Sequence, residues 1–477
     1  MTRNNKPLPL FENVEILDAG SEGNAVARAG DMVIFVPYAV PGDVVDIQVT
    51  RKKRSFAEGR AIHFHKYSDK RVQPFCEHFG TCGGCKWQHL RYKDQLFYKQ
   101  KQVEDNLVRI GKLEKPCILP ILGSPEQQYY RNKLEYTFSN HRWLTRDDPH
   151  GPLSEIEMNA LGFHIPRLFD KVLDIKNCYL QPSPSNDIRL FAKKYALGHG
   201  LSFYDVRTWT GLLRNLIIRN TTTGDLLVIL VFREDQDETI AGMLTEMLAA
   251  FPQITSLYYV INPKKNDVIN DLTLTHFFGQ KYMTERMPSF KTGDPDVEFR
   301  IGPVSFYQTN SRQAVNLYQT AMKFAAFMGD EIVYDLYTGT GTIANYMAPL
   351  VKKVVGIESI PAAIEDAKSN AKLNRLENVH FFAGETEKIL TPEFITENSK
   401  PDIIITDPPR SGMHEKVIRT LLSVSPAKII YVSCNPATQA RDILLLSGRY
   451  TMDQCQPIDM FPHTQHVENV ALLKRID

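Results

Sequence analysis

From about residue 300 onward, short apolar runs alternate with longer helical patterns. Five runs have the composition of buried strands, at residues 332–336, 354–357, 379–382, 403–406 and 429–432. The helical stretch 361–373 has Pro361 in its first turn and Ser359 as a candidate N-cap. Strands that alternate with helices form a parallel sheet covered on both faces. The sequence therefore predicts a doubly wound α/β domain, which two further strands near 453–459 and 467–474 complete.

The first of these strands runs into a glycine-containing loop, Tyr337-Thr-Gly339-Thr-Gly341-Thr342. Glycines directly after the first strand let a bound nucleotide approach the backbone, and Glu358, at the end of the second strand, can accept hydrogen bonds from ribose hydroxyls. The third glycine of the dinucleotide fingerprint is missing, because position 344 is Ala. This favours S-adenosylmethionine, which has no pyrophosphate. On the loop alone, an ordinary strand–helix turn remains an alternative.

Two later strands end in residues that can do chemistry. The fourth runs into Asp407-Pro-Pro-Arg410 and the fifth into Ser433-Cys434-Asn435-Pro436. Doubly wound sheets bind ligands at the carboxyl ends of their strands, so we expect Asp407 and Cys434 to face one crevice. A single cysteine is often an inert buried residue. At a strand end beside Asn-Pro, a nucleophile is the better interpretation of Cys434.

The chain has seven cysteines, and three of them are close together in the spacing Cys76-x5-Cys82-Gly-Gly-Cys85. An odd number of cysteines outside a secreted chain favours metal binding or catalysis over a disulfide framework. Four thiolates can hold zinc or an iron–sulfur cluster. The fourth ligand has to come from a distant position, and Cys117 and Cys178 are the candidates.

The N-terminal part alternates short strand-like runs with turn residues, at 14–17, 32–36, 44–49 and 59–64, which predicts a small β-barrel. Its last strands carry the basic stretch 51–71, with eight basic and two acidic residues in a chain of net charge +1. Such a stretch indicates an anionic partner such as nucleic acid, or simply a solvated surface. The middle of the chain is mixed, with a helix near 90–110 and a hairpin formed by 212–219 and 226–232.

Length and composition set the class of protein. A chain of 477 residues with 43% hydrophobic residues has enough apolar material for several folded domains. The longest apolar run, 226–232, is much too short to span a membrane. Residues 1–6 are polar and do not have the apolar core of a secretory signal. We therefore expect a cytoplasmic protein without membrane association.

Several motifs occur together in a distinctive order. They are Cys76/Cys82/Cys85, Phe306-Tyr-Gln308, Asp335–Gly341, Asp407-Pro-Pro-Arg410, Ser433-Cys434-Asn435-Pro436 and His466-Val-Glu468. In this set the chain resembles the RNA uracil-5-methyltransferase family over nearly its whole length. Within that family it is most similar to the 23S ribosomal RNA branch, which has an N-terminal TRAM domain and a [4Fe–4S] cluster. It departs from the usual pattern at Tyr337-Thr338-Gly339, where Phe-Cys-Gly is common, and at Thr342, where Asn is common.

The resemblance implies a role for each matching residue. Cys434 matches the nucleophile, Glu468 the base and Cys178 the fourth cluster ligand, while Cys117 and Cys455 are left as structural residues. The matched cofactor-binding positions are Gln308, Tyr337, Gly339, Gly341, Thr342, Glu358, Glu385 and Asp407. Asp407 can also hold the edge of the uracil.

The resemblance also implies three domains: a TRAM barrel of the OB-like type at 1–66, a mixed α/β domain with the iron–sulfur site at 67–285, and a Rossmann-like S-adenosylmethionine-dependent methyltransferase domain at 286–477. The expected activity is methyl transfer from S-adenosylmethionine to C5 of a uridine in 23S ribosomal RNA. We expect a monomer that needs no protein partner.

Two alternatives belong to other classes of protein, and a third lies within the same family. A radical S-adenosylmethionine methylthiotransferase can combine a TRAM domain with a cluster, but its cysteine spacing is C-x3-C-x2-C. An RNA-binding iron–sulfur protein that has lost catalysis would have no need for intact Cys434 and Glu468. A transfer-RNA uracil-5-methyltransferase usually lacks both the barrel and the cluster.

Overall fold

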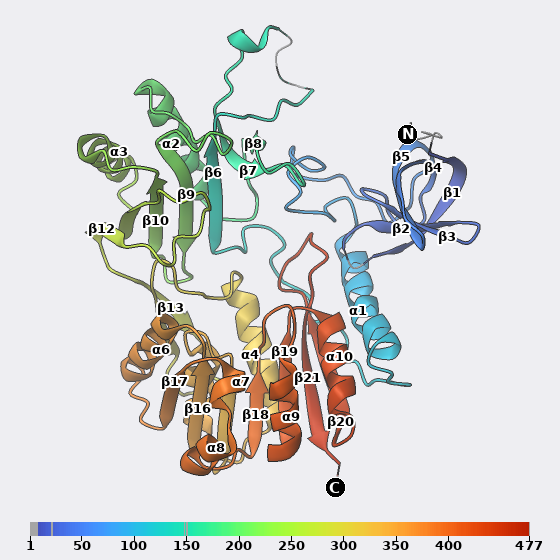
Figure 1. Ribbon diagram of the computed structural model, residues 1–477, viewed down its shortest axis with the longest axis vertical. Helices are drawn as coiled ribbons and strands as arrows, with labels where there is room; N and C mark the ends of the chain where they lie inside the picture. Colours follow the sequence, from blue (N-terminus) through green and yellow to red (C-terminus); the bar gives the residue numbers. More distant parts are fainter. Residues whose placement is uncertain (1–7, 21, 147, 149–150, 477) are drawn as a thin grey trace, which may run out of the picture. The chain divides into compact units, whose positions relative to one another are not determined.

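The computed structural model describes residues 8–20, 22–146, 148 and 151–476 (Figure 1). The polar residues 1–6, on which the expectation of no secretory signal depends, lie outside this part. The chain divides into two compact units. One consists of residues 1–127, 434–444 and 454–469, and the other of residues 128–433, 445–453 and 470–477. Within the described ranges, no helix is both long enough and apolar enough to cross a membrane.

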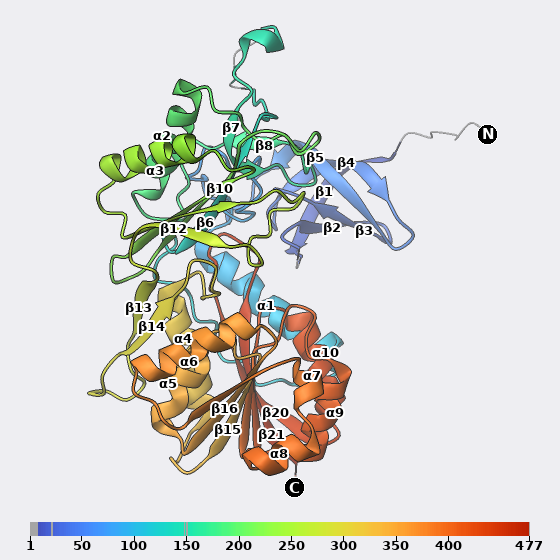
Figure 2. The ribbon, with the colours of Figure 1, turned by 60° about the vertical axis from the view of Figure 1, so that its left-hand side comes forward.

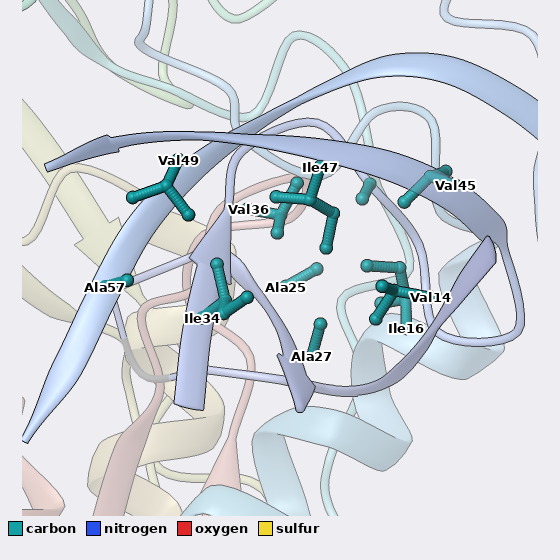
Figure 3. Packing of buried hydrophobic residues seen from close by; sticks show 11 residues of the cluster. Val14, Ile16, Ala25, Ala27, Ile34, Val36, Val45, Ile47, Val49 and Ala57 are labelled. Atoms are coloured by element: carbon teal, nitrogen blue, oxygen red, sulfur yellow. The ribbon is translucent and has the colours of Figure 1, made fainter. Parts of the chain in front are cut away.

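The first unit begins with a closed five-stranded barrel. Its strands follow the order β1-β2-β3-β5-β4, with bounds Leu10–Ala19 (β1), Ala25–Ala29 (β2), Met32–Val36 (β3), Val44–Lys52 (β4) and Phe56–Lys66 (β5). Small and β-branched side chains such as Ile16, Ile34 and Ile47 point into its interior (Figure 3). The predicted barrel is confirmed, but β2 was not anticipated, because Ala-Val-Ala-Arg-Ala contains only one strong strand former. A Cβ on Gly59 would lie 2.5 Å from Ile47 Cγ2, so this strand position requires glycine.

The first unit continues through the cysteine-containing loop into α1, Tyr92–Arg109. One face of this helix is buried, and that face includes Val103 and Leu107 but also Gln95 and Lys99. A fully buried lysine is rare unless it is paired, so this face of α1 has to meet polar partners.

The second unit contains a mixed seven-stranded sheet in the order β12-β11-β10-β9-β6-β7-β8. The bounds are Lys133–Ser139 (β6), Ala160–His164 (β7), Val172–Asp174 (β8), Leu213–Asn220 (β9), Leu226–Phe232 (β10), Ser256–Ile261 (β11) and Leu274–Gly279 (β12). Its helices are α2 (Ser185–Gly198), α3 (Asp237–Ala250) and the 3-10 turn η1 (Leu153–Glu155). The predicted hairpin is confirmed as the antiparallel pair β9–β10, in which every residue of β10 is buried. A separate two-stranded sheet pairs β13 (Met283–Met287) with β14 (Val297–Ile301).

The C-terminal sheet has the order β17-β16-β15-β18-β19-β21-β20. Its strands are β15 (Ile332–Leu336), β16 (Lys353–Glu358), β17 (Val379–Ala383), β18 (Ile403–Thr406), β19 (Lys428–Ser433), β20 (Tyr450–Ile458) and β21 (Glu468–Arg475). The first five pair in parallel, as the strand–helix alternation predicts. The predicted doubly wound α/β class is therefore confirmed.

Helices lie on both faces of this sheet, with α4–α6 on one side and α7–α9 on the other (Figure 2). Their bounds are α4 (Ser311–Ala325), α5 (Thr342–Met347), α6 (Pro361–Leu373), α7 (Thr386–Ile389), α8 (Pro392–Asn398), α9 (Glu415–Val424) and α10 (Pro436–Leu446), with the 3-10 turn η2 (Ala348–Leu350). Pro361 opens α6 as predicted, but the Ser359 cap is wrong. The N-cap is Ile360, which makes no side-chain cap, and Ser359 lies one residue too early, where its hydroxyl donates to Glu358 Oε1 at 2.9 Å.

Candidate active site

The loop between β15 and α5 turns through three residues with positive φ: Tyr337 (63°), Gly339 (57°) and Gly341 (73°). At Gly341 an added Cβ would lie 2.8 Å from Ala367 Cβ, so glycine is required both for φ and for packing. At Gly339 an added Cβ would meet nothing within 4 Å. The backbone at Gly339 therefore borders open space, which lets a ligand approach it closely.

Glu358, the last residue of β16, is held against this loop. Its Oε2 accepts a hydrogen bond from the Gly339 N–H at 3.1 Å, and its Oε1 accepts from the Ser359 hydroxyl at 2.9 Å and the Ile360 N–H at 3.0 Å. These three donors fix the carboxylate at the sheet edge beside the glycine loop. Carboxylates at this place in doubly wound folds accept hydrogen bonds from ribose hydroxyls.

Two aspartates follow or end neighbouring parallel strands at this edge. Asp335 in β15 is buried, and Asp407, which follows β18, is half-buried with its N–H bonded to the Leu336 carbonyl. Burial raises the pKa of Asp335 to about 7. The hydrogen bond from the Thr338 hydroxyl opposes this increase, and the negative charge of Asp407 adds to it. Burial likewise raises the pKa of Asp407 to about 7. Both carboxyls are thus poised to be partly protonated at neutral pH, a property that clusters at functional sites.

Asp335 was not among the site residues expected from the sequence, although it begins the motif Asp335–Gly341. A signal was present, since a carboxylate in the otherwise apolar run Val333-Tyr-Asp-Leu336 is unusual for a fully buried strand. Its burial beside Asp407 became visible only once β15 and β18 were paired.

The Gln308 loop is fastened to the same region. The Thr340 hydroxyl donates to the Phe306 carbonyl at 3.2 Å, and the Gln308 carbonyl accepts from Asn132 Nδ2 at 2.9 Å. The Thr342 hydroxyl is 3.1 Å from the hydroxyl of Tyr318 in α4. The structure therefore brings the Gln308 loop to the glycine loop that carries the other predicted cofactor positions.

Glu385 is the N-cap residue of α7 and follows Gly384, whose N–H donates to the Glu358 carbonyl at 2.7 Å. It therefore lies at the same edge of the sheet. Its exposed carboxylate pairs with Lys388 at 2.6 Å, and this hydrogen bond lowers the pKa of Glu385. Glu385 thus has a cationic partner, whereas the more enclosed Asp335 accepts from the Thr338 hydroxyl.

Cys434 and Glu468 belong to the first unit. Cys434 directly follows β19, and Glu468 is the first residue of β21, which neighbours β19 in the sheet. The Arg475 N–H, at the end of β21, donates to the carbonyl of Ala427, just before β19. The two strands therefore run antiparallel, and Glu468 lies at the edge where β19 leads into Cys434. Glu468 is buried and Cys434 is partly exposed.

A reciprocal amide pair joins the segments that carry these two residues. Gln439, in the helix after Cys434, donates from Nε2 to the Asn469 carbonyl at 3.2 Å. Asn469, the neighbour of Glu468, donates from Nδ2 to Gln439 Oε1 at 2.7 Å. Both amides are fully buried. The pair therefore fixes the start of α10 and the start of β21 relative to each other.

The three clustered cysteines lie on a tight loop. Backbone N–H groups of His78 and Phe79 donate toward the Cys76 sulfur and that of Gly84 toward the Cys82 sulfur, while burial raises the pKa of both thiols. Backbone N–H groups directed at sulfur are typical of iron–sulfur sites. Among the described residues, however, no three His, Cys, Asp or Glu side chains are grouped so as to hold a metal ion.

The remaining cysteines differ in their surroundings. Cys178 lies in the second unit, where Asn186 accepts from its N–H at 2.8 Å and donates to its carbonyl at 3.0 Å. Cys455 is fully buried, and its N–H donates to the carbonyl of the exposed Cys117. The four-cysteine site, with Cys178 as the fourth ligand, stays a prediction.

Comparisons with known proteins agree with this architecture. The family model "tRNA (Uracil-5-)-methyltransferase" matches residues 220–476, and the TRAM domain model matches residues 12–62. An uncharacterized RNA methyltransferase of Bacteroides thetaiotaomicron is 55% identical over 95% of this chain and 99% of its own. Another, from Chlorobaculum tepidum, is 40% identical over 92% of this chain and 90% of its own.

A solved structure is similar over nearly the whole molecule. The crystal structure of the Pyrococcus abyssi tRNA (uracil-54, C5)-methyltransferase in complex with S-adenosyl-L-homocysteine covers 97% of this chain and 100% of its own, with 28% identity and a TM-score of 0.74. Because the family model spans more than half of the chain and the relatives align over nearly all of it, this protein belongs to the RNA uracil-5-methyltransferase family and is an S-adenosylmethionine-dependent enzyme with an N-terminal TRAM barrel.

Proposed function

We propose that this enzyme methylates C5 of a specific uridine in 23S ribosomal RNA, with Cys434 as nucleophile and Glu468 as base. The observation that carries the catalytic assignment is the buried Gln439–Asn469 amide pair, which ties the helix after Cys434 to the residue after Glu468. A nucleophile and a base that act on one ring have to be held at a constant separation.

The reaction begins at uracil C6, because C5 alone is a poor nucleophile. The Cys434 thiolate adds to C6, which forms a C6–S bond and leaves an enolate with electron density at C5. C5 then attacks the donor methyl group, so that a C5–CH3 bond forms as the S–CH3 bond of the sulfonium breaks. S-adenosylmethionine, when bound, supplies this methyl group as an activated cation and departs as S-adenosylhomocysteine.

Glu468 completes the reaction. Its carboxylate removes the proton from C5, the ring double bond re-forms, and the C6–S bond breaks to return the Cys434 thiolate. Asp407 has a separate role, since at a pKa of about 7 it is partly protonated and can donate a hydrogen bond to a uracil oxygen as the enolate forms.

The second unit fits the methyl donor. Gly339 leaves backbone open to a ligand, and Glu358 presents a fixed carboxylate at the position suited to ribose hydroxyls. We assign Gln308, Tyr337, Gly341, Thr342, Glu385 and Asp407 to the same site because their loops meet at one sheet edge. Ala at 344, in place of a phosphate-loop glycine, agrees with a ligand that has no pyrophosphate.

The choice of RNA substrate depends on the N-terminal barrel and the cysteine loop. Six basic residues of the 51–71 stretch are exposed on or beside β4 and β5: Arg51, Lys52, Lys53, Arg54, Arg60 and Lys66. Nearby, Phe64 and Tyr67 stack at 5.0 Å, and Tyr67 is largely exposed. Cationic and aromatic side chains together suit phosphates and unstacked bases of RNA. The similarity of the whole motif set to the ribosomal branch carries the assignment to ribosomal RNA, because the barrel lies largely within the 97% of this chain that a transfer-RNA enzyme also covers.

Transfer RNA is the second candidate, because the Pyrococcus relative, a tRNA enzyme by name, matches nearly all of this chain. Mass mapping of 5-methyluridine in ribosomal and transfer RNA from a deletion strain separates the two. We expect one or more 23S sites to lose the methyl group while transfer RNA is unchanged. Loss confined to transfer RNA would contradict the ribosomal assignment and leave the chemistry intact.

We further propose that residues 1–66 and 67–285 bind RNA, that residues 286–477 carry out catalysis, and that Cys76, Cys82, Cys85 and Cys178 hold a [4Fe–4S] cluster. The backbone N–H groups directed at the sulfurs of Cys76 and Cys82 support two members of this ligand set. We expect the enzyme to act as a monomer in the cytoplasm, where its ribosomal substrate is made. Sedimentation of the enzyme with and without RNA tests whether it is a monomer.

A further inference from the structure

The segment that leads to Glu468 is polar, irregular and buried. Residues 459–468, here called the base segment, run from the end of β20 to Glu468, the first residue of β21. Four of its polar residues are each less than a tenth exposed: Asp459, His463, Gln465 and Glu468. His463 has a φ of 65°, a left-handed conformation that persists only when the surroundings enforce it. Buried polar groups need hydrogen-bond partners, so neighbouring elements must hold this segment in place.

Lys99 of α1 holds the start of the base segment. Its Nζ donates to Asp459 Oδ1 at 2.5 Å and to the Phe461 carbonyl at 3.0 Å, and both side chains of the ion pair are fully buried. The Tyr92 hydroxyl, about two turns earlier in α1, donates to Asp459 Oδ2 at 2.9 Å. Both oxygens of Asp459 are thereby fixed by the same helix.

Gln95 of α1 holds the middle of the base segment. Its Oε1 accepts from the His463 N–H at 2.9 Å, and its Nε2 lies 3.2 Å from His463 Nδ1. The same Nε2 donates to the carbonyls of Trp87 and Leu90. The backbone of His463 is therefore held by the carbonyl oxygen of one buried amide, and the nitrogen of that amide is in contact with the ring.

The cysteine loop and the barrel reach the base segment as well. Trp87, two residues after Cys85, donates from its backbone N–H to the His463 carbonyl at 2.9 Å. Its indole Nε1 donates to the carbonyl of Gly23, in the turn before β2, at 3.1 Å. A Cβ on Gly23 would lie 3.1 Å from Gln465 Oε1. Helix α1, the end of the cysteine loop and a barrel turn thus meet on residues 463–465.

We propose that Lys99 and Gln95 are positioning residues for catalysis, which hold the base segment so that Glu468 meets the proton on C5. This inference rests on the proposed function, in which Glu468 is the base. Only the last step uses Glu468, because thiol addition and methyl transfer precede proton removal. A displacement of about 1 Å can cost on the order of 10²-fold in rate. Loosening the base segment should therefore slow elimination selectively.

The test counts competent enzyme before it measures turnover. RNA with 5-fluorouridine at the target traps the enzyme after methyl transfer, since C5 then carries no proton to remove, so adduct yield reports folded enzyme independently of the base. Gln95→Met keeps the length of the side chain and removes its hydrogen bonds. Lys93→Met, at an exposed position of the same helix, is the matched control.

We expect Gln95→Met to trap fluorouridine RNA nearly as well as the wild type. On ordinary RNA, its turnover per competent enzyme should fall on the order of 10²-fold while the covalent enzyme–RNA complex accumulates. Lys93→Met should behave as the wild type. Because Lys99→Met leaves a buried unpaired carboxylate and can fail to fold, the double variant Lys99→Met/Asp459→Leu removes both charges and should show the same accumulation.

A purely structural role predicts the opposite pattern. If the variants lose competent enzyme but turn over at the wild-type rate per competent molecule, without accumulated complex, the proposal is overturned. Glu468→Gln in the same assay keeps the two proposals apart. Accumulation in Glu468→Gln alone overturns the positioning role only, whereas its absence in Glu468→Gln overturns the base assignment and the positioning role with it.

Discussion

Asp335 and Asp407 in the second unit and Asp459 in the first are carboxyl groups shielded from water, Asp407 the least because it is half-buried, but their surroundings differ. The interactions that shift the pKa of Asp335 and Asp407 include no cation, and burial raises both values to about 7. Asp459 instead has the buried Lys99 at 2.5 Å and the Tyr92 hydroxyl at 2.9 Å.

One chain thus uses buried carboxyl groups in two ways. A carboxyl without a cation titrates near neutral pH and is available to a substrate, at a cost in stability. A carboxylate with a buried cation is fixed in place, and breaking such a pair is strongly destabilising. This difference accords with the proposal that the second unit binds the methyl donor and the first unit carries the covalent chemistry.

The substitution with the largest effect should abolish covalent catalysis and leave binding of the methyl donor intact. Cys434→Ala should lower kcat on the order of 10⁶-fold, as removal of a catalytic nucleophile does elsewhere, because C6 addition becomes impossible. Binding of S-adenosylhomocysteine, measured by calorimetry, should be unchanged, since the donor site lies on other residues. Wild-type enzyme should form a stable adduct with 5-fluorouridine RNA. No adduct, alongside full activity on normal RNA, would remove Cys434 from the mechanism.

Glu468→Gln should have the next largest effect. Loss of a general base typically costs about 10²–10⁴-fold. Thiol addition and methyl transfer should still occur, so denaturing gels should show the covalent complex on ordinary uridine RNA. Asp453→Asn, on the neighbouring strand and paired with Lys474 instead, is a suitable control. Wild-type turnover by Glu468→Gln would mean that another group removes the proton.

The raised pKa values of Asp335 and Asp407 lead to a prediction about pH. Their pKa is about 7 in the folded state against 3.8 unperturbed, so the native state binds more protons, and their contribution to the free energy of unfolding falls as pH rises from about 4 through 7. If protonated Asp407 donates to the uracil, kcat/KM should decline above about pH 7. Asp407→Asn keeps a donor and should flatten the profile. An unchanged profile would exclude that role.

The smallest effect on methyl transfer is expected for the proposed cluster ligands Cys76, Cys82, Cys85 and Cys178, because the methyl transfer involves no electron transfer. Anaerobically purified protein should be brown and contain about four irons per chain. Cys178→Ser should lose much of that iron, with lower stability or RNA affinity before any change at Cys434, while Cys117→Ser keeps it. Colourless, active protein holding one zinc would replace the cluster assignment and leave the methyltransferase intact.

Several features could be predicted because their signals are local. The strand 403–406 and the helix start at Pro361 follow from short-range periodicity and from the fixed φ of proline. The glycine loop was recognisable because left-handed φ values favour glycine wherever they occur. The positions of Cys434 and Asp407 after parallel strands followed from chain order alone, since carboxyl ends of such strands share an edge.

Other features were decided only by tertiary structure. Lys99 and Asp459 are 360 positions apart, and a lysine in a helix that is also rich in charged and polar residues suggests a solvated face until its partner is known. Likewise, the amide pair of Gln439 and Asn469 exists only because α10 packs beside the start of β21. The raised pKa values of Asp335 and Asp407 arise mainly from burial, to which the charge of Asp407 adds at Asp335. Burial and pairing are properties of contacts between distant segments, so the motifs that nominate Cys434 and Glu468 as catalytic could be found in the sequence, whereas the groups proposed to hold and tune them could not.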